Sequence, residues 1–119
     1  MMKHKIIIGK RQTGKTELLI KESAEKQIPI ICMSISHTKE IERRAKEMGL
    51  DIPYPVPASY TGLKELIRPY NSVIVDDAAL ILRYLLGKDI DTVAINTGHE
   101  ELEPIEVIYT EVAKNDSAE

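Results

Sequence analysis

The sequence predicts an α/β protein: a single domain with a mainly parallel five-stranded sheet and helices on both faces, an α/β/α three-layer sandwich. Short runs of β-branched residues alternate with segments of helical periodicity, the order typical of parallel sheets with right-handed crossovers. The chain has 119 residues, 43% of them hydrophobic, which suits one domain and is too short for two of ordinary size. We therefore expect one domain over residues 1–113, followed by a flexible C-terminal tail over residues 114–119.

The first half of the chain supplies two predicted strands and two predicted helices. Residues 5–8 form an apolar, β-branched run that stops at Gly9, which is typical of a buried strand. Residues 15–26 favour a helix, with leucines on one side and an i, i+4 ion-pair spacing on the other. The nearly continuous apolar run over residues 28–34 suits a strand covered on both faces. Residues 37–49 then repeat apolar residues at helical spacing and stop at a glycine.

A proline-rich connector leads into the second half of the chain. Prolines at alternate positions within residues 51–59 remove backbone donors and favour an extended path, so we expect a connector or an edge strand. Residues 59–69 then predict a short helix. Its inward-facing residues are expected to be Leu63, Leu66 and Ile67.

The remaining elements follow in the same alternating order. Residues 72–75 predict a strand that ends in two aspartates. The helix after it stops at Gly87 and carries Leu82, Leu85 and Leu86 on one face. Two further strands complete the predicted sheet, at residues 92–96 and 105–110.

Composition excludes several classes of protein. The net charge of −3 leaves no global basic field for nonspecific nucleic-acid binding. Cys32 is the single cysteine, which excludes an internal disulfide and a cysteine-rich metal site and suits a reducing cytosol. No apolar stretch approaches the length needed to span a bilayer. We therefore expect a cytoplasmic protein without a membrane partner, in the host cytoplasm if its source is viral.

The turn after the first strand carries a phosphate-binding pattern. Gly9, Gly14, Lys15 and Thr16 satisfy G-x-x-x-x-G-K-[ST] between a predicted strand and a predicted helix, the context that this pattern requires. The glycines let backbone amides converge, Lys15 can reach the β- and γ-phosphates, and Thr16 can ligate Mg²⁺. The alternative is a turn that only caps a helix. The predicted nucleotide-binding residues are Gly9, Lys10, Arg11, Gln12, Thr13, Gly14, Lys15 and Thr16.

A carboxylate for the metal is expected at the end of the third strand. The segment "SVIVDD" brings Asp76 to the carboxyl end of that strand, where open α/β sheets place their ligands. Together with Thr16 it forms the predicted Mg²⁺ site. An ordinary loop carboxylate is the alternative interpretation.

These residues resemble a known superfamily. "GKRQTGKT" is similar to a Walker A loop and "VIVDD" to a Walker B strand, so the chain resembles the P-loop nucleoside triphosphatases. Within them it looks closest to the branch with an additional strand, which includes RecA-like, AAA-type, helicase and viral DNA-packaging ATPases. "DDAALI" and "NTG" are reminiscent of viral terminase ATPase cores. The resemblance implies a P-loop fold, ATP and Mg²⁺ as ligands, and a phage source.

The resemblance also implies roles for individual residues. Asp76 matches the metal-side aspartate, and Asp77 stands where this branch usually carries a water-orienting glutamate. Aspartate is one methylene shorter, so its carboxylate falls roughly 1.5 Å short of the usual place. Asn96, beside Thr97, matches a polar residue that senses the γ-phosphate, with a capped strand end as the alternative. Lys15, Asp77 and Asn96 are thus the predicted catalytic residues.

Other residues carry weaker signals. Arg11 either approaches the γ-phosphate or a neighbouring subunit, or is a solvated arginine. A basic cluster in the second predicted helix is interpreted as a solvated face, because acidic residues alternate with it. Three tyrosines near the proline-rich connector could stack on a base, or could cover the sheet edge; they are Tyr54, Tyr60 and Tyr70.

Together these observations predict an ATP-binding protein that is a slow Mg²⁺-dependent ATPase acting in nucleic-acid processing. The expected partners are a nucleoside triphosphate, DNA or a DNA-processing protein, and further copies of the chain in a homo-oligomer. Two alternatives stay open. One is a kinase for a nucleotide or another small molecule. The other is a nonhydrolysing, nucleotide-responsive binding module, which the short side chain of Asp77 favours.

Overall fold

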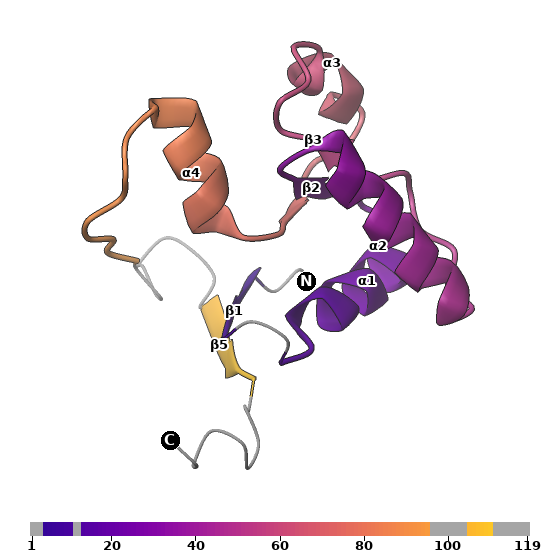
Figure 1. Ribbon diagram of the computed structural model, residues 1–119. Helices are drawn as coiled ribbons and strands as arrows, with labels where there is room; N and C mark the ends of the chain where they lie inside the picture. The colour runs from indigo at the N-terminus through magenta and orange to yellow at the C-terminus, as the bar shows by residue number, and fades with distance from the viewer. Residues whose placement is uncertain (1–3, 11–12, 96–104, 111–119) are drawn as a thin grey trace. The chain divides into compact units, whose positions relative to one another are not determined.

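The computed structural model describes residues 4–10, 13–95 and 105–110, and it shows an α/β protein whose described strands all pair in parallel (Figure 1). These strands form a sheet of two, β1-β5, and a sheet of three in the order β3-β2-β4. The prediction of one five-stranded sheet is therefore wrong. By spatial proximity the chain divides into two compact units, residues 1–15 with 92–119 and residues 16–91. The predicted tail, residues 114–119, lies outside the described residues, and the single domain over 1–113 stays a prediction.

The first unit contains a two-stranded parallel sheet. β1 (His4–Ile8) pairs with β5 (Ile105–Tyr109) in a register that places Ile6 opposite Val107. The Thr110 amide donates to the Ile8 carbonyl at 2.9 Å, so the pairing continues to the last described residue of this unit. Both strands were predicted from the sequence and both are formed, but β1 was expected to be buried and is not: its residues are exposed or half-buried, and Ile8 is 43% exposed, since the two-stranded sheet gives it only one neighbouring strand.

The strand predicted at residues 92–96 is not formed. Residues 92–95 have no regular structure, and Val93 and Ile95 are 51% and 54% exposed. Apolar β-branched residues favour a strand only where a neighbouring strand supplies pairing and burial. Within the described part of the chain this run has no strand beside it. Asn96, the last residue of the predicted strand, lies outside the described residues.

The second unit is built around a three-stranded parallel sheet. Its central strand, β2 (Ile30–Cys32), is buried along its whole length, as its continuous apolar run predicts. β4 (Ile74–Val75) lies on one side of it, and the Asp76 amide extends the pairing by donating to the Ile31 carbonyl at 2.9 Å. β3 (Val56–Pro57) lies on the other side as an edge strand, which confirms one of the two forms expected for the proline-rich connector.

The predicted helices are all present. They are α1 (Lys15–Lys26), α2 (Ile35–Glu47), α3 (Leu63–Ile67) and α4 (Ala78–Leu86). Spanning a bilayer takes about 20 apolar residues, and none of these helices is long and apolar enough to do so.

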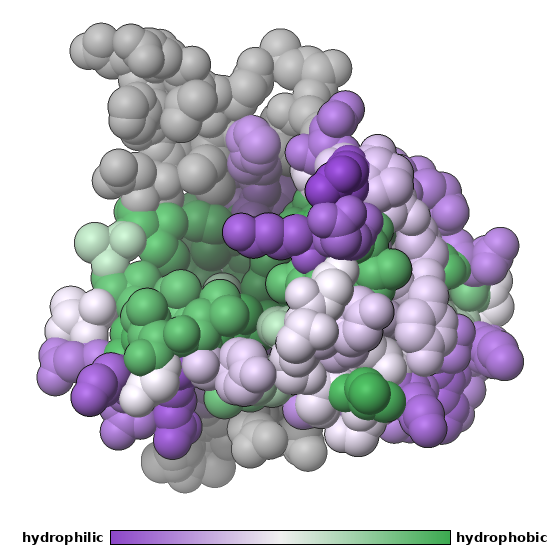
Figure 2. Space-filling view, turned by 90° about the horizontal axis from the view of Figure 1, so that it is seen from above, coloured by the Kyte–Doolittle hydropathy of each residue, from purple (hydrophilic) through white to green (hydrophobic). Residues whose placement is uncertain are grey.

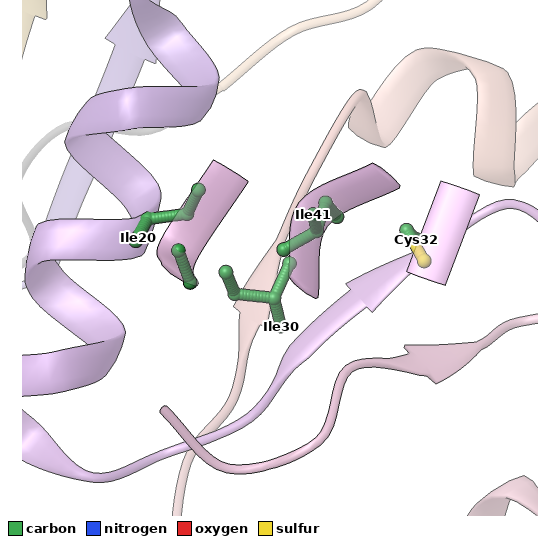
Figure 3. Packing of buried hydrophobic residues seen from close by; sticks show 5 residues of the cluster. Ile20, Ile30, Cys32 and Ile41 are labelled. Carbon is green, nitrogen blue, oxygen red and sulfur yellow. The ribbon is translucent and has the colours of Figure 1, made fainter. Parts of the chain in front are cut away.

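Helices cover both faces of the three-stranded sheet. On one face, Ile20 of α1 and Ile41 of α2 pack with Ile30 and Cys32 of β2 (Figure 3). Ile31 points to the opposite face, because successive strand residues alternate sides. There it packs in a second cluster, whose other buried members are Val56, Ala58 and Ile81, with Leu63 and Ile67 against it. The core of this unit is thus aliphatic, as the scarcity of aromatic residues implies.

The leucine face predicted for α4 does not enter this core. Ile81 is buried, whereas Leu82, Leu85 and Leu86 are 40%, 60% and 62% exposed. β4 is only two residues long, so it offers α4 a short surface for packing. Exposed apolar surface, drawn in green, is visible in Figure 2. Leu66, which was expected to point inward from α3, is also exposed, at 50%.

Cys32 gives a first testable prediction. Burial raises the pKa of its thiol to about 11, and the nearby Asp76 carboxylate adds to the rise. Because the folded protein disfavours the thiolate, the thiol should resist iodoacetamide in native protein near neutral pH and react in urea. Mass spectrometry of the alkylated chain measures this difference.

The same pKa shift has a consequence for stability. The contribution of the protonated Cys32 thiol to the free energy of unfolding is fully present below the pKa of an unfolded thiol, about 8.5. It is lost as the pH rises toward the higher pKa of the thiol in the folded protein. The difference in free energy of unfolding between the wild type and Cys32→Ala, measured by urea titration, should therefore decrease over that alkaline range. Rapid alkylation of the native protein, or a constant difference, would contradict this account.

Candidate phosphate-binding site

The loop between β1 and α1 is the segment that the sequence predicts to hold phosphate. It leaves the sheet at Gly9 and ends where α1 begins at Lys15. Gly14 has a φ angle of +88°, a left-handed conformation that glycine adopts without steric cost. The first turn of α1 follows at once, and the N–H groups of a first turn have no partner within their helix. A helix start that follows such a turn is suited to binding an anion. Arg11 and Gln12 lie outside the described residues.

Gly9 is required by the close approach of the chain after β5. A Cβ atom at Gly9 would lie 1.7 Å from Thr110 Oγ1 and 2.9 Å from Thr13 Oγ1. These two hydroxyls are themselves within hydrogen-bond distance, at 2.6 Å, and the Thr13 hydroxyl lies 2.7 Å from the Lys10 carbonyl. The loop is therefore held by β5 as well as by its own residues. Thr110 was not predicted as part of this region.

The side chain of Lys15 folds back over the loop. Its ammonium donates to the Gly9 carbonyl at 2.7 Å and also to the Lys10 carbonyl. An ammonium has three N–H donors, so one remains for another acceptor. The fixed positive charge thus lies at the loop itself, at the start of α1.

The predicted metal ligands belong to the second unit. Thr16 lies in the first turn of α1, and Asp76 follows β4 with its backbone tied to β2. Both side chains are partly exposed. Within residues 4–10, 13–95 and 105–110, no cluster of three or more His, Cys, Asp or Glu residues could hold a metal ion. Mg²⁺ commonly binds through one or two protein oxygens, phosphates and water. The pairing of Thr16 with Asp76 on one ion stays a prediction.

Asp77 has a structural role that its sequence position did not reveal. It is the N-cap of α4, and its Oδ1 accepts a hydrogen bond from the Leu80 amide at 3.3 Å. Its φ and ψ angles are 60° and 65°, in the left-handed region that aspartate enters more readily than most residues. One oxygen of the predicted water-orienting carboxylate is thus used to begin a helix. The catalytic role of Asp77 stays a prediction.

The structure thus gathers part of the predicted site into one place. The side chains and carbonyls of Gly9, Lys10, Thr13 and Lys15 contact one another within the loop. Asn96, the predicted γ-phosphate sensor, lies outside the described residues. Thr110 is the residue that sequence reasoning missed, and only the pairing of β5 with β1 could have indicated it.

Comparisons of the chain with protein families, curated proteins and solved structures find no match. The functional argument therefore depends on the loop, its flanking elements and the chemistry of their residues.

Proposed function

We propose that the protein binds ATP with Mg²⁺ through the loop of residues 9–16, and that it is a slow ATPase acting in nucleic-acid processing in the cytoplasm. One observation carries the proposal: a G-x-x-x-x-G-K-T loop joins a parallel strand to a helix, and the Lys15 ammonium lies over that loop, 2.7 Å from the Gly9 carbonyl.

Different groups at the site would make different interactions with the nucleotide. Backbone amides of the loop and of the first turn of α1 would donate to phosphate oxygens. Lys15 would add a full charge, and each such charge-assisted hydrogen bond contributes about 1.5–3 kcal/mol. Thr16 and Asp76 would hold Mg²⁺ against the β- and γ-phosphates. The metal would neutralise the negative charge of the phosphates that the loop does not neutralise.

Hydrolysis is proposed to be slow because of Asp77. Its side chain is shorter than the glutamate usual at this position, and its Oδ1 is engaged with the Leu80 amide. The hydrogen bond to Leu80 also favours a second candidate function, a nonhydrolysing module that changes its binding properties with ATP. The two candidates share the same site and differ in turnover.

Calorimetric titration with ATP, with and without Mg²⁺, tests the shared site. We expect binding that strengthens with Mg²⁺, because the ion screens the phosphates and adds the Thr16 and Asp76 contacts. Failure of Mg²⁺–ATP to bind at millimolar concentration would contradict the proposal.

Phosphate release then separates the two candidates. It should be measured over a range of protein concentrations, with and without single- and double-stranded DNA, since assembly and DNA are the expected partners. Slow release supports the ATPase. Tight ATP binding without release under every condition supports the binding module, and transfer of phosphate to an added nucleoside would replace both with a kinase.

A further inference from the structure

The second unit contains a pocket that the proposed nucleotide site does not use. Its volume is about 400 Å³, within the range of small-ligand sites, and its lining includes residues of α2, β3 and α3. Three tyrosines line it, Tyr54, Tyr60 and Tyr70, with Ile35 and Thr38 contributed by α2. Every residue of its lining is uncharged, in a chain of which 29% is charged. The pocket is therefore suited to a flat, largely apolar group.

The three tyrosine rings are available to a ligand. Tyr54, Tyr60 and Tyr70 are 55%, 49% and 36% exposed. Among the described residues, none of their hydroxyls has a hydrogen-bond partner. Each ring can thus offer a face for stacking and a hydroxyl for a hydrogen bond, without first breaking a hydrogen bond to another described residue.

One of these rings lies against the backbone at Gly62. A Cβ atom at Gly62 would lie 2.5 Å from Cε2 of Tyr60, so the ring occupies the space that a side chain would otherwise fill. Gly62 therefore offers a way to move Tyr60 without deleting it.

The start of α2 gives the pocket an edge that suits an anion. Ser34 is the N-cap, yet its side chain does not cap the backbone; it lies instead 3.1 Å from Ser36 Oγ and 2.9 Å from His37 Nδ1. The first turn carries no acidic residue, and Lys39 follows it. The His37 and Thr38 amides donate to the Ser34 carbonyl, whereas the Ile35 and Ser36 amides have no acceptor among the described residues and lie next to the Ile35 and Thr38 side chains that line the pocket.

We propose that this pocket binds an unpaired base of a single-stranded nucleic acid. The tyrosines stack on the base, as aromatic side chains do when they bind single strands, and the start of α2 binds an adjoining backbone phosphate. The base supplies a planar group for an uncharged pocket, and the strand supplies the anion for its edge. A peptide strand is a poorer occupant, because Pro57 in the edge strand and Pro55 just before it have no backbone donor. The proposal goes beyond the ATP site and uses none of its residues.

Oligonucleotide binding without ATP tests the proposal. The probes are a labelled oligothymidine and a strand of equal length made of abasic sites, which has the same charge and no bases. Replacing Tyr54, Tyr60 or Tyr70 by alanine should weaken oligothymidine binding roughly 5- to 150-fold, the range for loss of one stacked base. The phenylalanine variants keep the ring and should bind within a few-fold of the wild type. The abasic strand should bind as weakly as the alanine variants.

Matched controls identify the pocket as the site. Tyr84→Ala removes an equally exposed tyrosine, 47%, from α4 outside the pocket, and should leave binding unchanged. Gly62→Ala retains all three tyrosines and should weaken binding by displacing the Tyr60 ring. Lys15→Ala should bind oligothymidine as the wild type does, so the tests of the ATP site and of this pocket are independent of each other. Circular dichroism of each variant verifies its fold.

Three results would overturn the proposal. The first is no binding of oligothymidine by the wild type. The second is equal binding of the abasic strand, which would show that charge alone is responsible. The third is binding of a capped, uncharged oligoproline at the tyrosines in place of oligothymidine, which would assign the pocket to a proline-rich protein partner.

Discussion

Replacing Lys15 by alanine is expected to weaken ATP binding about 100-fold or more. The ammonium is the charge that the structure places over the loop, 2.7 Å from the Gly9 carbonyl, and it would contact two phosphates of the bound nucleotide. Losing two charge-assisted hydrogen bonds, at about 1.5–3 kcal/mol each, corresponds to that loss of affinity or more. Calorimetric titration with Mg²⁺–ATP measures it directly.

Lys21→Ala is the matched control for this change. Lys21 is an exposed lysine of the same helix and lies outside the loop, so its loss removes the same charge from the chain without removing the proposed contact. Its ATP affinity should equal that of the wild type. Urea unfolding should show that Lys15→Ala remains folded, because the two bonds it loses within the protein are partly or fully exposed. Equal ATP binding by Lys15→Ala and the wild type would show that the site is elsewhere.

The parts of the fold that sequence patterns predict correctly are the local ones. The β-branched run before Gly9, the helical spacing after Lys15 and the continuous apolar run of β2 each determine an element through neighbouring residues. The loop between β1 and α1 is equally local, so its glycines and lysine could be recognised in the sequence. This is why the centre of the candidate site follows from a stretch of eight residues.

The pairing of the strands is not local, and the sequence alone does not determine it. β5 begins 97 positions after Ile8 along the chain and nevertheless pairs with β1, while β2 takes β3 and β4 as its neighbours. Alternation of strands and helices predicts parallel pairing but not how many strands share one sheet. Thr110 could not be assigned to the loop for the same reason.

Periodicity also does not predict which helix faces are buried. A stripe of leucines on α4 indicates an apolar face, but it does not reveal whether another element covers that face. In the structure Leu85 is 60% exposed, whereas Ile81, four residues earlier, is buried and only 7% exposed. Likewise, Asp77 matches a catalytic position in a motif, and only its left-handed backbone and the bond to Leu80 reveal a capping role.

Gly9→Ala is expected to damage both the fold and the site, because the added methyl would lie 1.7 Å from Thr110 Oγ1. Forcing a methyl group into a filled space costs about 1–3 kcal/mol, through shifts of backbone and side chains. Such a shift would displace the loop whose amides are proposed to bind phosphate, so ATP affinity should fall together with the urea midpoint. Circular dichroism during urea titration and calorimetry measure the two effects.

The residue that causes the clash also indicates a second substitution that should relieve it. Thr110→Gly removes the closest of the contacts that the new methyl would make and leaves the hydroxyl of Thr13 at 2.9 Å, so the double variant Gly9→Ala, Thr110→Gly should regain part of the lost stability and ATP affinity. Gly14→Ala is the matched control: its Cβ would meet nothing within 4 Å, and its cost comes from a φ angle of +88°. Thr110→Gly should therefore fail to rescue Gly14→Ala. If it rescued neither alanine variant, the position of Thr110 against the loop would be wrong, and with it the pairing of β5 with β1 that brings residues 9 and 110 together.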